Sequence, residues 1–135
     1  MNRRIVLASI CTLIAFGVGI SVVQSIQIAE KYSDVFFADA TYYPEKKIVE
    51  IRFEDHTQKT NRVVLEVLGM DPSFQRTFDA SSFTTTVPFD AVPQYGWKVT
   101  PVTFVVEHED FGTVGIKIDI HNAGESAGNM IFSDL

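Results

Sequence analysis

The amino-acid sequence predicts an all-β domain, a single antiparallel sandwich of about seven strands, preceded by one N-terminal transmembrane helix. Three observations lead to this fold class. A long apolar run follows Arg3 and Arg4, apolar and polar residues alternate from about residue 39 onward, and turn-forming residues separate the alternating segments. Alternation with a period of two is typical of strands that bury one face and expose the other.

The apolar run covers residues 5–23, nineteen residues in which Cys11 is the sole ionisable side chain. A helix of this length, rising about 1.5 Å per residue, is about 29 Å long and matches the roughly 30 Å hydrocarbon core of a bilayer. The sequence therefore predicts a cytoplasmic stub and transmembrane signal-anchor helix at residues 1–30, which contacts the lipid bilayer through residues 5–23. Residues 31–38 are expected to form a juxtamembrane linker or an extension of this helix.

The flanking charges predict the orientation of this helix. Two arginines precede the apolar run, whereas only Lys31 follows it closely. The positive-inside rule then predicts a single-pass cell-membrane protein with a cytoplasmic N-terminus and an extracytoplasmic C-terminal domain. A cleaved signal peptide is the alternative. Signal peptides have apolar regions of about 7–15 residues that end in small residues, so the longer run, without a clear Ala-x-Ala site, favours a retained anchor.

The clearest predicted strand covers residues 114–120, in which valine and isoleucine at the even positions alternate with Gly115, Lys117 and Asp119. Residues 102–106 repeat the pattern, and residues 108–112 between them are expected to form a hairpin loop with Gly112 at a position of positive φ. Further strands are predicted at residues 48–53, 62–67 and 83–89, with weaker ones near Thr41 and at residues 74–78.

These strands place an extracytoplasmic β-sandwich at residues 39–121 and leave residues 122–135 as a C-terminal tail. Pro101 is expected at a strand start or a bulge, because proline cannot donate a hydrogen bond to a neighbouring strand. Cys11 is the only cysteine of the chain and lies in the apolar run. The predicted sandwich therefore has no disulfide, and its core alone must stabilise it.

The order of these segments carries a resemblance. The stretch Tyr43-Pro44-Glu45-Lys46-Lys47-Ile48-Val49-Glu50-Ile51 is followed by residues 63–68, a Phe/Thr strand, and Gly96 leading into residues 102–106. This pattern resembles the immunoglobulin-like and fibronectin-III-like β-sandwich domains of archaeal and bacterial membrane-anchored surface proteins, over roughly residues 38–120. The resemblance implies an Ig-like sandwich and a role in adhesion, in envelope architecture or as an accessory subunit.

Charge narrows the class of partner. The formal net charge is −6 at pH 7, and such a chain lacks the Lys/Arg-rich face that binds nucleic acid. Arg3 and Arg4 are two of the 11 basic residues, and all 17 acidic residues lie from residue 30 onward, so this part carries a net charge of −8. No nucleic-acid partner is expected, and a basic protein or cations are favoured as neighbours over anionic lipid.

The most concentrated polar cluster is Glu107, His108, Glu109 and Asp110, whose carboxylates and imidazole are possible ligands for a divalent cation or contacts for a partner. Its ligands lack the spacing of a calcium loop, and adjacent residues of a strand point to opposite faces. A solvated hairpin tip is therefore the main expectation. His121 follows Asp119 at the strand period, and both are expected on a polar surface.

The chain shows no set of residues typical of catalysis. It contains no Gly-x-Ser-x-Gly elbow, no glycine-rich phosphate loop and no His-Glu-x-x-His helix. Its three scattered histidines do not form the three or four converging ligands of a zinc or copper site. We expect no catalytic residue, metal or other cofactor, no small-molecule substrate, and a protein that is not an enzyme.

The tail holds one apolar triplet, Met130, Ile131 and Phe132, in a stretch otherwise rich in Gly, Ser, Asn and Ala. The triplet is expected to pack on its own sandwich or to fray, and its alternative is to add a strand to the edge of another chain.

Together these features predict a non-catalytic, membrane-anchored extracytoplasmic structural or interaction module that binds another surface or envelope protein. An accessory subunit of a multi-subunit membrane enzyme or transporter, held through the transmembrane helix, is the alternative. A secreted β-sandwich with a cleaved signal peptide is the second alternative.

Overall fold

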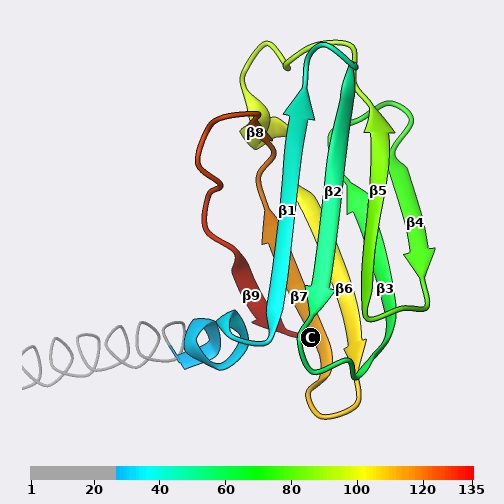
Figure 1. The fold of residues 1–135 in the computed structure, drawn as a ribbon, viewed down its shortest axis with the longest axis vertical. Helices are drawn as coiled ribbons and strands as arrows, with labels where there is room; N and C mark the ends of the chain where they lie inside the picture. The colour runs from blue at the N-terminus through cyan, green and yellow to red at the C-terminus, as the bar shows by residue number, and fades with distance from the viewer. Residues whose placement is uncertain (1–26) are drawn as a thin grey trace, which may run out of the picture.

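The computed structural model describes residues 27–135 and consists of a short helix followed by two β-sheets (Figure 1). The transmembrane helix predicted at residues 5–23 lies outside the described residues. Within residues 27–135, no helix has the length and apolar character needed to cross a bilayer. The helix covers residues 27–33, and the strands, in chain order, are β1 (Phe36–Tyr43), β2 (Ile48–Asp55), β3 (Thr60–Val67), β4 (Phe74–Phe78), β5 (Ser82–Pro88), β6 (Val102–His108), β7 (Gly112–Ile118), β8 (His121–Asn122) and β9 (Ile131–Asp134), with a 3₁₀ turn η1 (Trp97–Val99) before β6.

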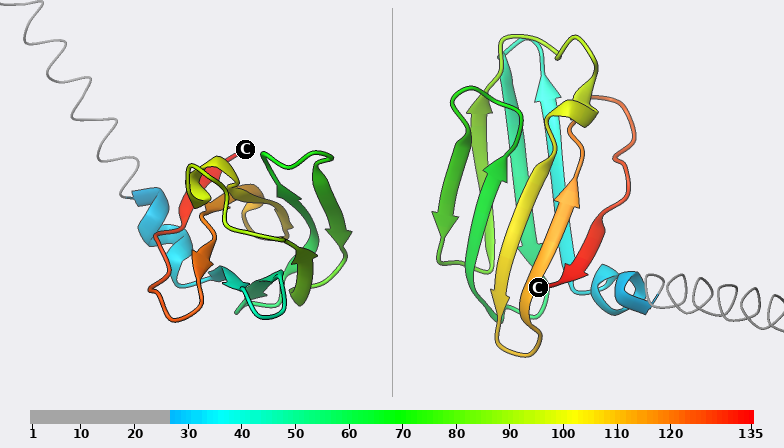
Figure 2. Two further views of the ribbon diagram at one scale, coloured as in Figure 1. Left: turned by 90° about the horizontal axis from the view of Figure 1, so that it is seen from above. Right: turned by 180° about the vertical axis from the view of Figure 1, so that it is seen from behind.

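The strands form two sheets that lie face to face. The first sheet has the order β5-β2-β1-β8 and the second the order β4-β3-β6-β7-β9. Every pairing is antiparallel except that of β1 with β8, which is parallel. Figure 2 (right) shows the second sheet from behind, with β6 in its middle and β9 at its edge. The prediction of an all-β fold with antiparallel strands is confirmed.

The core forms from side chains that alternate along the strands. In β2 the odd-numbered Val49, Ile51 and Phe53 are fully buried, whereas Glu50 and Arg52 face outward, as the period of two requires. Aromatic rings connect the sheets: Phe53 stacks on Phe104 across the core at a centroid distance of 5.8 Å. The largest fully buried side chains are those of Tyr32, Phe36, Phe53, Phe104, Ile51 and Leu65.

The end of the chain crosses between the sheets twice. After β7 the chain leaves the second sheet and pairs with β1 of the first sheet as β8, through Thr41–His121 and Tyr42–Asn122. Residues 123–129 then run over the surface without burial, and β9 returns to pair with β7 of the second sheet. This segment therefore closes one open side of the sandwich, so that the expected tail 122–135 contributes a strand to the second sheet.

The short helix is attached to the sandwich by Tyr32. Its ring is fully buried and packs on Phe36, Phe111 and Phe132, with centroid distances of 6.0, 5.2 and 5.7 Å. The Tyr32 hydroxyl donates a hydrogen bond to the Asp134 carboxylate. Burial and this hydrogen bond raise the pKa of Tyr32, since both disfavour the phenolate. The first residues of the described chain and its last strand are thereby joined at one point.

The boundaries differ from the expected ones at both ends. β1 begins at Phe36, inside the expected linker 31–38 and three residues before the expected sandwich start at residue 39. The described chain has nine strands instead of the expected seven or so, and the two additional ones are the short strands β8 and β9 of the C-terminal segment. Both differences arise from long-range contacts, because Phe36 pairs with Asp55 and Ile131 with Lys117.

Candidate interaction site

The sandwich has two ends of different character. We call the end that carries helix 27–33 and the C-terminus the base; it also holds the turns at residues 55–59, 79–81 and 108–112 (Figures 1 and 2). We call the opposite end the distal end; it holds the turn at residues 44–47 and the longer loops at residues 68–73 and 89–101. The two ends differ in how their polar and apolar side chains are arranged.

At the base, the Asp55 carboxylate is held by four donors. Oδ1 accepts from the backbone N–H of Thr57 at 2.8 Å and from its hydroxyl at 2.6 Å. Oδ2 accepts from the backbone N–H of Lys59 at 3.0 Å and from the hydroxyl of Thr60 at 2.7 Å. Burial alone would raise the pKa of Asp55, but the hydrogen bonds from Thr57, Thr60 and Lys59 outweigh it and lower the pKa. The carboxylate thus fixes the turn between β2 and β3.

His108 extends this network to the second sheet. Its Nε2 lies 2.9 Å from the Thr57 hydroxyl and 3.3 Å from Asp55 Oδ2, while its Nδ1 accepts from the backbone N–H of Asp110 at 3.1 Å. Because Nδ1 accepts a hydrogen bond, the ring proton lies on Nε2. The side chains of His108 and Asp55 both have an exposed fraction of 0%. The β2–β3 turn and the β6–β7 hairpin are therefore joined by a buried, fully paired polar contact.

This Thr–His–Asp set has the residue types of a hydrolase triad but a different geometry. In a triad, the nucleophile and the acid contact opposite ring nitrogens, so that the ring passes a proton between them. Here Thr57 and Asp55 share the same nitrogen, Nε2 of His108, and the hydroxyl of Thr57 donates to the carboxylate. The cluster is built to hold two turns together.

The polar cluster predicted at Glu107, His108, Glu109 and Asp110 does not converge on one point. His108 points into the core, whereas Glu107, Glu109 and Asp110 are exposed. Asp110 forms an ion pair with Lys59, with its Oδ2 2.9 Å from Nζ. Among residues 27–135 no group of three or more histidine, cysteine, aspartate or glutamate side chains is arranged to hold a metal ion.

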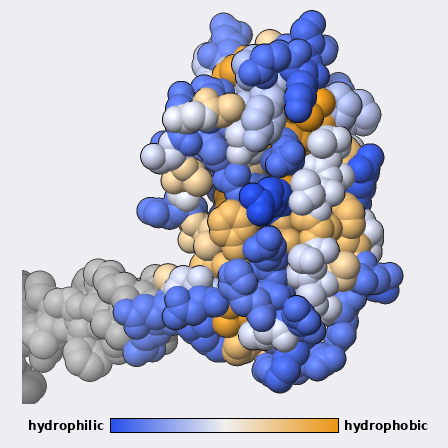
Figure 3. Space-filling view, viewed as in Figure 1, coloured by the Kyte–Doolittle hydropathy of each residue, from blue (hydrophilic) through white to orange (hydrophobic). Residues whose placement is uncertain are grey.

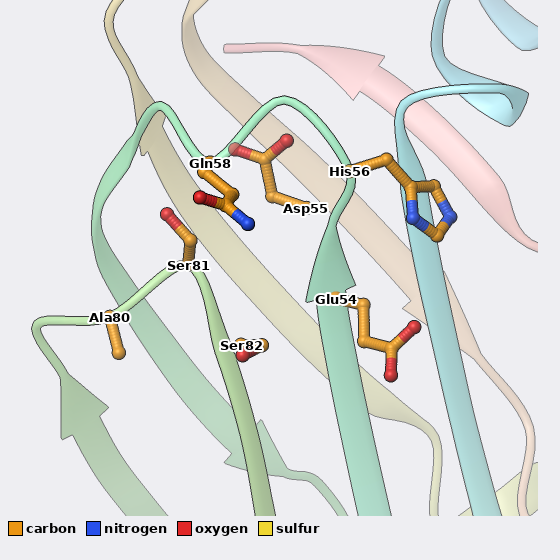
Figure 4. A pocket seen from close by; sticks show the side chains of 7 residues that line it. All are labelled: Glu54, Asp55, His56, Gln58, Ala80, Ser81 and Ser82. Atoms are coloured by element: carbon orange, nitrogen blue, oxygen red, sulfur yellow. The ribbon is translucent and has the colours of Figure 1, made fainter.

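An open hollow of about 500 Å³ lies beside this network, lined by Glu54, Asp55, His56, Gln58, Ala80, Ser81 and Ser82. Figure 4 shows that His56 lies over β1, whereas Gln58 and Ser81 lie on the opposite side of the hollow. Asp55 is already saturated by its four donors and His108. The lining groups do not point toward a common ligand.

A second aspartate–histidine pair lies at the crossing between the sheets. His121 Nε2 lies 2.7 Å from Asp39 Oδ1 and 3.2 Å from the Thr41 hydroxyl, and the Thr41 hydroxyl donates to Asp39 Oδ2 at 2.7 Å. The His121 Nδ1 lies 3.0 Å from the carbonyl oxygen of Asn122. Asp39 is on β1, so this contact fastens β8 to the edge of the first sheet. His121 therefore pairs with Asp39, while Asp119 is exposed without an ion pair among the described residues.

The distal end is organised by Trp97. Its indole N–H donates to Asn122 Oδ1 at 2.9 Å, and its ring packs on Tyr42 and Phe89 with centroid distances of 5.1 and 5.7 Å. The Tyr42 hydroxyl in turn donates to the carbonyl of Asp90 at 3.3 Å. Residues 89–101 form the longest connection between two strands in the described chain, and these contacts hold it against the first sheet.

The two distal loops touch each other at Gly69. Its φ is +75°, and a side chain there would collide with the backbone carbonyl of Val99. The backbone N–H of Leu68 donates to the carbonyl of Pro101 at 3.0 Å. Glycine therefore lets the loop at residues 68–73 lie directly against the loop at residues 89–101.

The rigid distal loops expose apolar side chains to solvent. Tyr95 has an exposed fraction of 80% and Val99 of 45%, and Val92 and Leu68 are also exposed. Half of the large apolar side chains that are exposed in residues 27–135 lie on these two loops. Figure 3 looks onto the first sheet: blue hydrophilic residues dominate the rim, a few orange residues lie among them at the distal end, and paler or tan residues run across the middle. We name Leu68, Val92, Tyr95 and Val99 the distal apolar site.

The predicted docking triplet of the tail is divided between core and surface. Phe132 packs against Tyr32 and the core, Met130 is half-buried, and Ile131 has an exposed fraction of 61%. Met130 and Phe132 thus pack on their own sandwich, whereas Ile131 faces solvent. The distal apolar site was not predicted, because its residues stand singly in turn-forming stretches, where the sequence does not distinguish a buried from an exposed tyrosine or valine.

Comparison of the chain with protein-family models, with curated proteins and with solved structures gave no significant match.

Proposed function

We propose that this protein is a non-catalytic, membrane-anchored extracytoplasmic interaction module that binds another surface or envelope protein through its distal apolar site. The observation that carries the proposal is the exposure of Tyr95, Val99, Val92 and Leu68 on loops that are held rigidly in place. Tyrosine and aliphatic side chains at a rigid, exposed site are typical of protein–protein contacts, because little conformational entropy is lost on binding.

The strand arrangement supports an Ig-like assignment. In immunoglobulin domains the second and fifth strands pair in one sheet, and the third, sixth and seventh strands form the other. The same division occurs here, with β2 and β5 paired and β3, β6 and β7 together. β4 departs from the constant-domain arrangement, because it pairs with β3 instead of joining the first sheet. In variable domains the binding loops at one end include those between the second and third and between the sixth and seventh strands. The corresponding turns here, at residues 55–59 and 108–112, lie at the base, so the distal apolar site is proposed from its own exposure and not from this likeness.

The position of the distal apolar site fits an anchored protein. The site lies at the end of the sandwich opposite helix 27–33, and an anchor at residues 5–23 would leave it accessible outside the cell. The acidic charge of the domain favours a partner with a basic surface around an apolar patch.

The experiment is site-specific cross-linking in cells that produce the protein. A photoreactive amino acid replaces Tyr95 in one variant and Thr84, on the outer face of the first sheet, in a control. We expect a single cross-linked protein from position 95 that is absent from position 84, and loss of this product when Val99→Asp is added. Equal products at both positions, or none at position 95, would contradict the proposal.

The anchor is tested separately by the mass of the mature N-terminus. A mass that begins at Met1 supports retention of residues 5–23 in the membrane, whereas a mass that begins after Ser21 or Ser25 removes the anchor from the proposal.

A further inference from the structure

The outer face of the second sheet carries different, complementary side chains on the two sides of its middle strand, β6. Cross-strand pairing places outward residues in rows that run through β3, β6 and β7. One row holds Glu66, Thr103 and Lys117, and the next holds Val64, Val105 and Gly115. Val105 has an exposed fraction of 37% although it lies at the centre of the sheet. This face therefore has an uncovered apolar centre flanked by opposite charges.

We propose that a second copy of this chain packs on this face, around a two-fold axis that runs along β6. Such an axis places β3 of one copy opposite β7 of the other. Each row of one copy then faces the equivalent row of the other copy. Closed two-fold pairing of one surface with itself is the commonest form of homo-oligomer. The proposal is independent of the distal apolar site, which lies on the end loops.

Charge complementarity is the first argument for a second copy as the occupant. Glu66 and Lys117 lie two strands apart, about 9–10 Å at a spacing of about 4.8 Å per strand, and within residues 27–135 neither forms an ion pair. The two-fold axis places Glu66 of each copy opposite Lys117 of the other. Two intermolecular ion pairs thus form from charges that have no partner within one copy.

Shape complementarity is the second argument. Gly115 lacks a side chain and forms the floor of a hollow of about 280 Å³ that Val105, Ile131 and Leu135 border. Ser133 and Leu135 lie so close to Gly115 that a Cβ there would come within 2.6 Å of the Ser133 Oγ. The axis places Val64 of one copy over this hollow of the other. Because Ser133 and Leu135 already occupy the space above Gly115, Val64 meets the apolar border formed by Val105, Ile131 and Leu135, once in each copy.

One position on the face opposes dimerisation. A third outward row holds Arg62, Glu107 and Thr113, with Glu107 on β6. The axis brings Glu107 of one copy close to Glu107 of the other. Five strands about 4.8 Å apart give a face roughly 20 Å wide, and strands of at most 8 residues, rising about 3.3 Å per residue, make it roughly 26 Å long. Its flat area of about 500 Å² is smaller than the roughly 800 Å² per partner of standard complexes. The dimer is therefore reversible and depends on protein concentration.

The test is a charge exchange in the full chain, purified in detergent and followed by sedimentation over a concentration series. Glu66→Lys alone and Lys117→Glu alone each place like charges together, and we expect each to weaken dimerisation about tenfold or more. The double variant restores opposite charges, and we expect it to dimerise like the wild type. Glu107→Gln removes the like-charge contact, and we expect it to dimerise more tightly than the wild type.

A second measurement places the contact. Val105→Cys in a Cys11→Ser background puts one thiol per chain on the axis, and a short bismaleimide cross-linker suits sheets that pack about 10 Å apart. We expect cross-linked dimers from position 105, and none from the control Thr84→Cys on the first sheet. A monomer at all concentrations, a double variant no better than the single variants, or equal cross-linking at position 84 would overturn the proposal.

Discussion

Two aspartate–histidine pairs hold distant parts of the chain together, and they do so in different surroundings. The base pair, Asp55 with His108, has no exposed side-chain area, whereas the pair at the sheet crossing, Asp39 with His121, has exposed fractions of 18% and 15%. The base pair is the longer of the two, at 3.3 Å against 2.7 Å. Distance alone would therefore rank the crossing pair as the stronger contact.

Burial and additional partners reverse that ranking. Asp55 receives four further hydrogen bonds, whereas Asp39 receives one further hydrogen bond, from Thr41. A fully buried polar group that loses its partner has no water to replace it, so its loss costs more than the loss of a partly exposed pair. The free-energy cost of breaking such a pair therefore depends on the number of polar groups left unpaired, rather than on the length of the aspartate–histidine contact.

The largest expected effect is the difference between two alanine substitutions. Asp55→Ala leaves Thr60 and His108 buried without their acceptor, and we expect a loss of about 3 kcal/mol or more in the free energy of unfolding. Asp39→Ala exposes its partners to water, and we expect a loss of about 0.5–1 kcal/mol. Urea unfolding followed by circular dichroism measures both. Equal losses would refute the ranking by burial.

The next effect is on the pH dependence of stability. Because hydrogen bonds lower the pKa of Asp55 below its ordinary value of 3.8, the stability it adds is present above that value and is lost as the pH falls through its folded-state pKa. We expect the unfolding free energy of Asp55→Asn to fall less steeply than that of the wild type in acid, below about pH 4. Asp39→Asn is the control for the loss of one carboxylate, and it should leave the contribution of Asp55 in place.

Tyr32 extends the comparison to a buried donor. Tyr32→Phe keeps the ring among its aromatic neighbours but removes the hydrogen bond to Asp134, and we expect a loss of about 1 kcal/mol. Burial raises the pKa of Tyr32 above its ordinary value of 10.0, so its contribution is complete below that value and is lost as the pH rises through the folded-state pKa. Unfolding in alkali should therefore depend less steeply on pH in Tyr32→Phe; an unchanged alkaline limb would count against this role.

The last prediction concerns the position of the ring protons of two histidines and involves no change in stability. The Nδ1 of His108 accepts from a backbone N–H, whereas the Nδ1 of His121 lies against a carbonyl oxygen. We expect a proton on Nε2 of both rings, because the Nε2 of His121 lies 2.7 Å from Asp39 Oδ1, which can only accept. Nitrogen chemical shifts of the two rings measure this, and a proton on Nδ1 of His108 would contradict the described network.

Part of this arrangement was predictable from the sequence. The alternation in residues 102–106 and 114–118 identifies β6 and β7 because each strand buries one face, and local residue patterns record that burial. The same alternation indicates the inward direction of His108, which shares the parity of Phe104 and Val106. The parity of Ile51 and Phe53 likewise points Asp55 into the core. The cluster at residues 107–110 was interpreted from its composition as a solvated hairpin tip, so the inward direction of His108 was not predicted.

The rest depends on contacts between segments far apart in sequence. β9 is four residues long and contains serine and aspartate, so nothing local marks it as a strand of the second sheet. Its partner β7 and the ring of Tyr32 define its place. The distal apolar site depends likewise on Trp97, which reaches Asn122 of the C-terminal segment. A local pattern does not contain such pairings.

The placement of helix 27–33 and the distal loops at opposite ends has a mechanical consequence. Tension applied between them runs along the strands, while the hydrogen bonds between antiparallel strands lie across them. The eight residue pairs that join β1 to β2 are then loaded together in shear instead of opening one after another. A module pulled in this direction resists extension more strongly than the same sheet pulled at one corner.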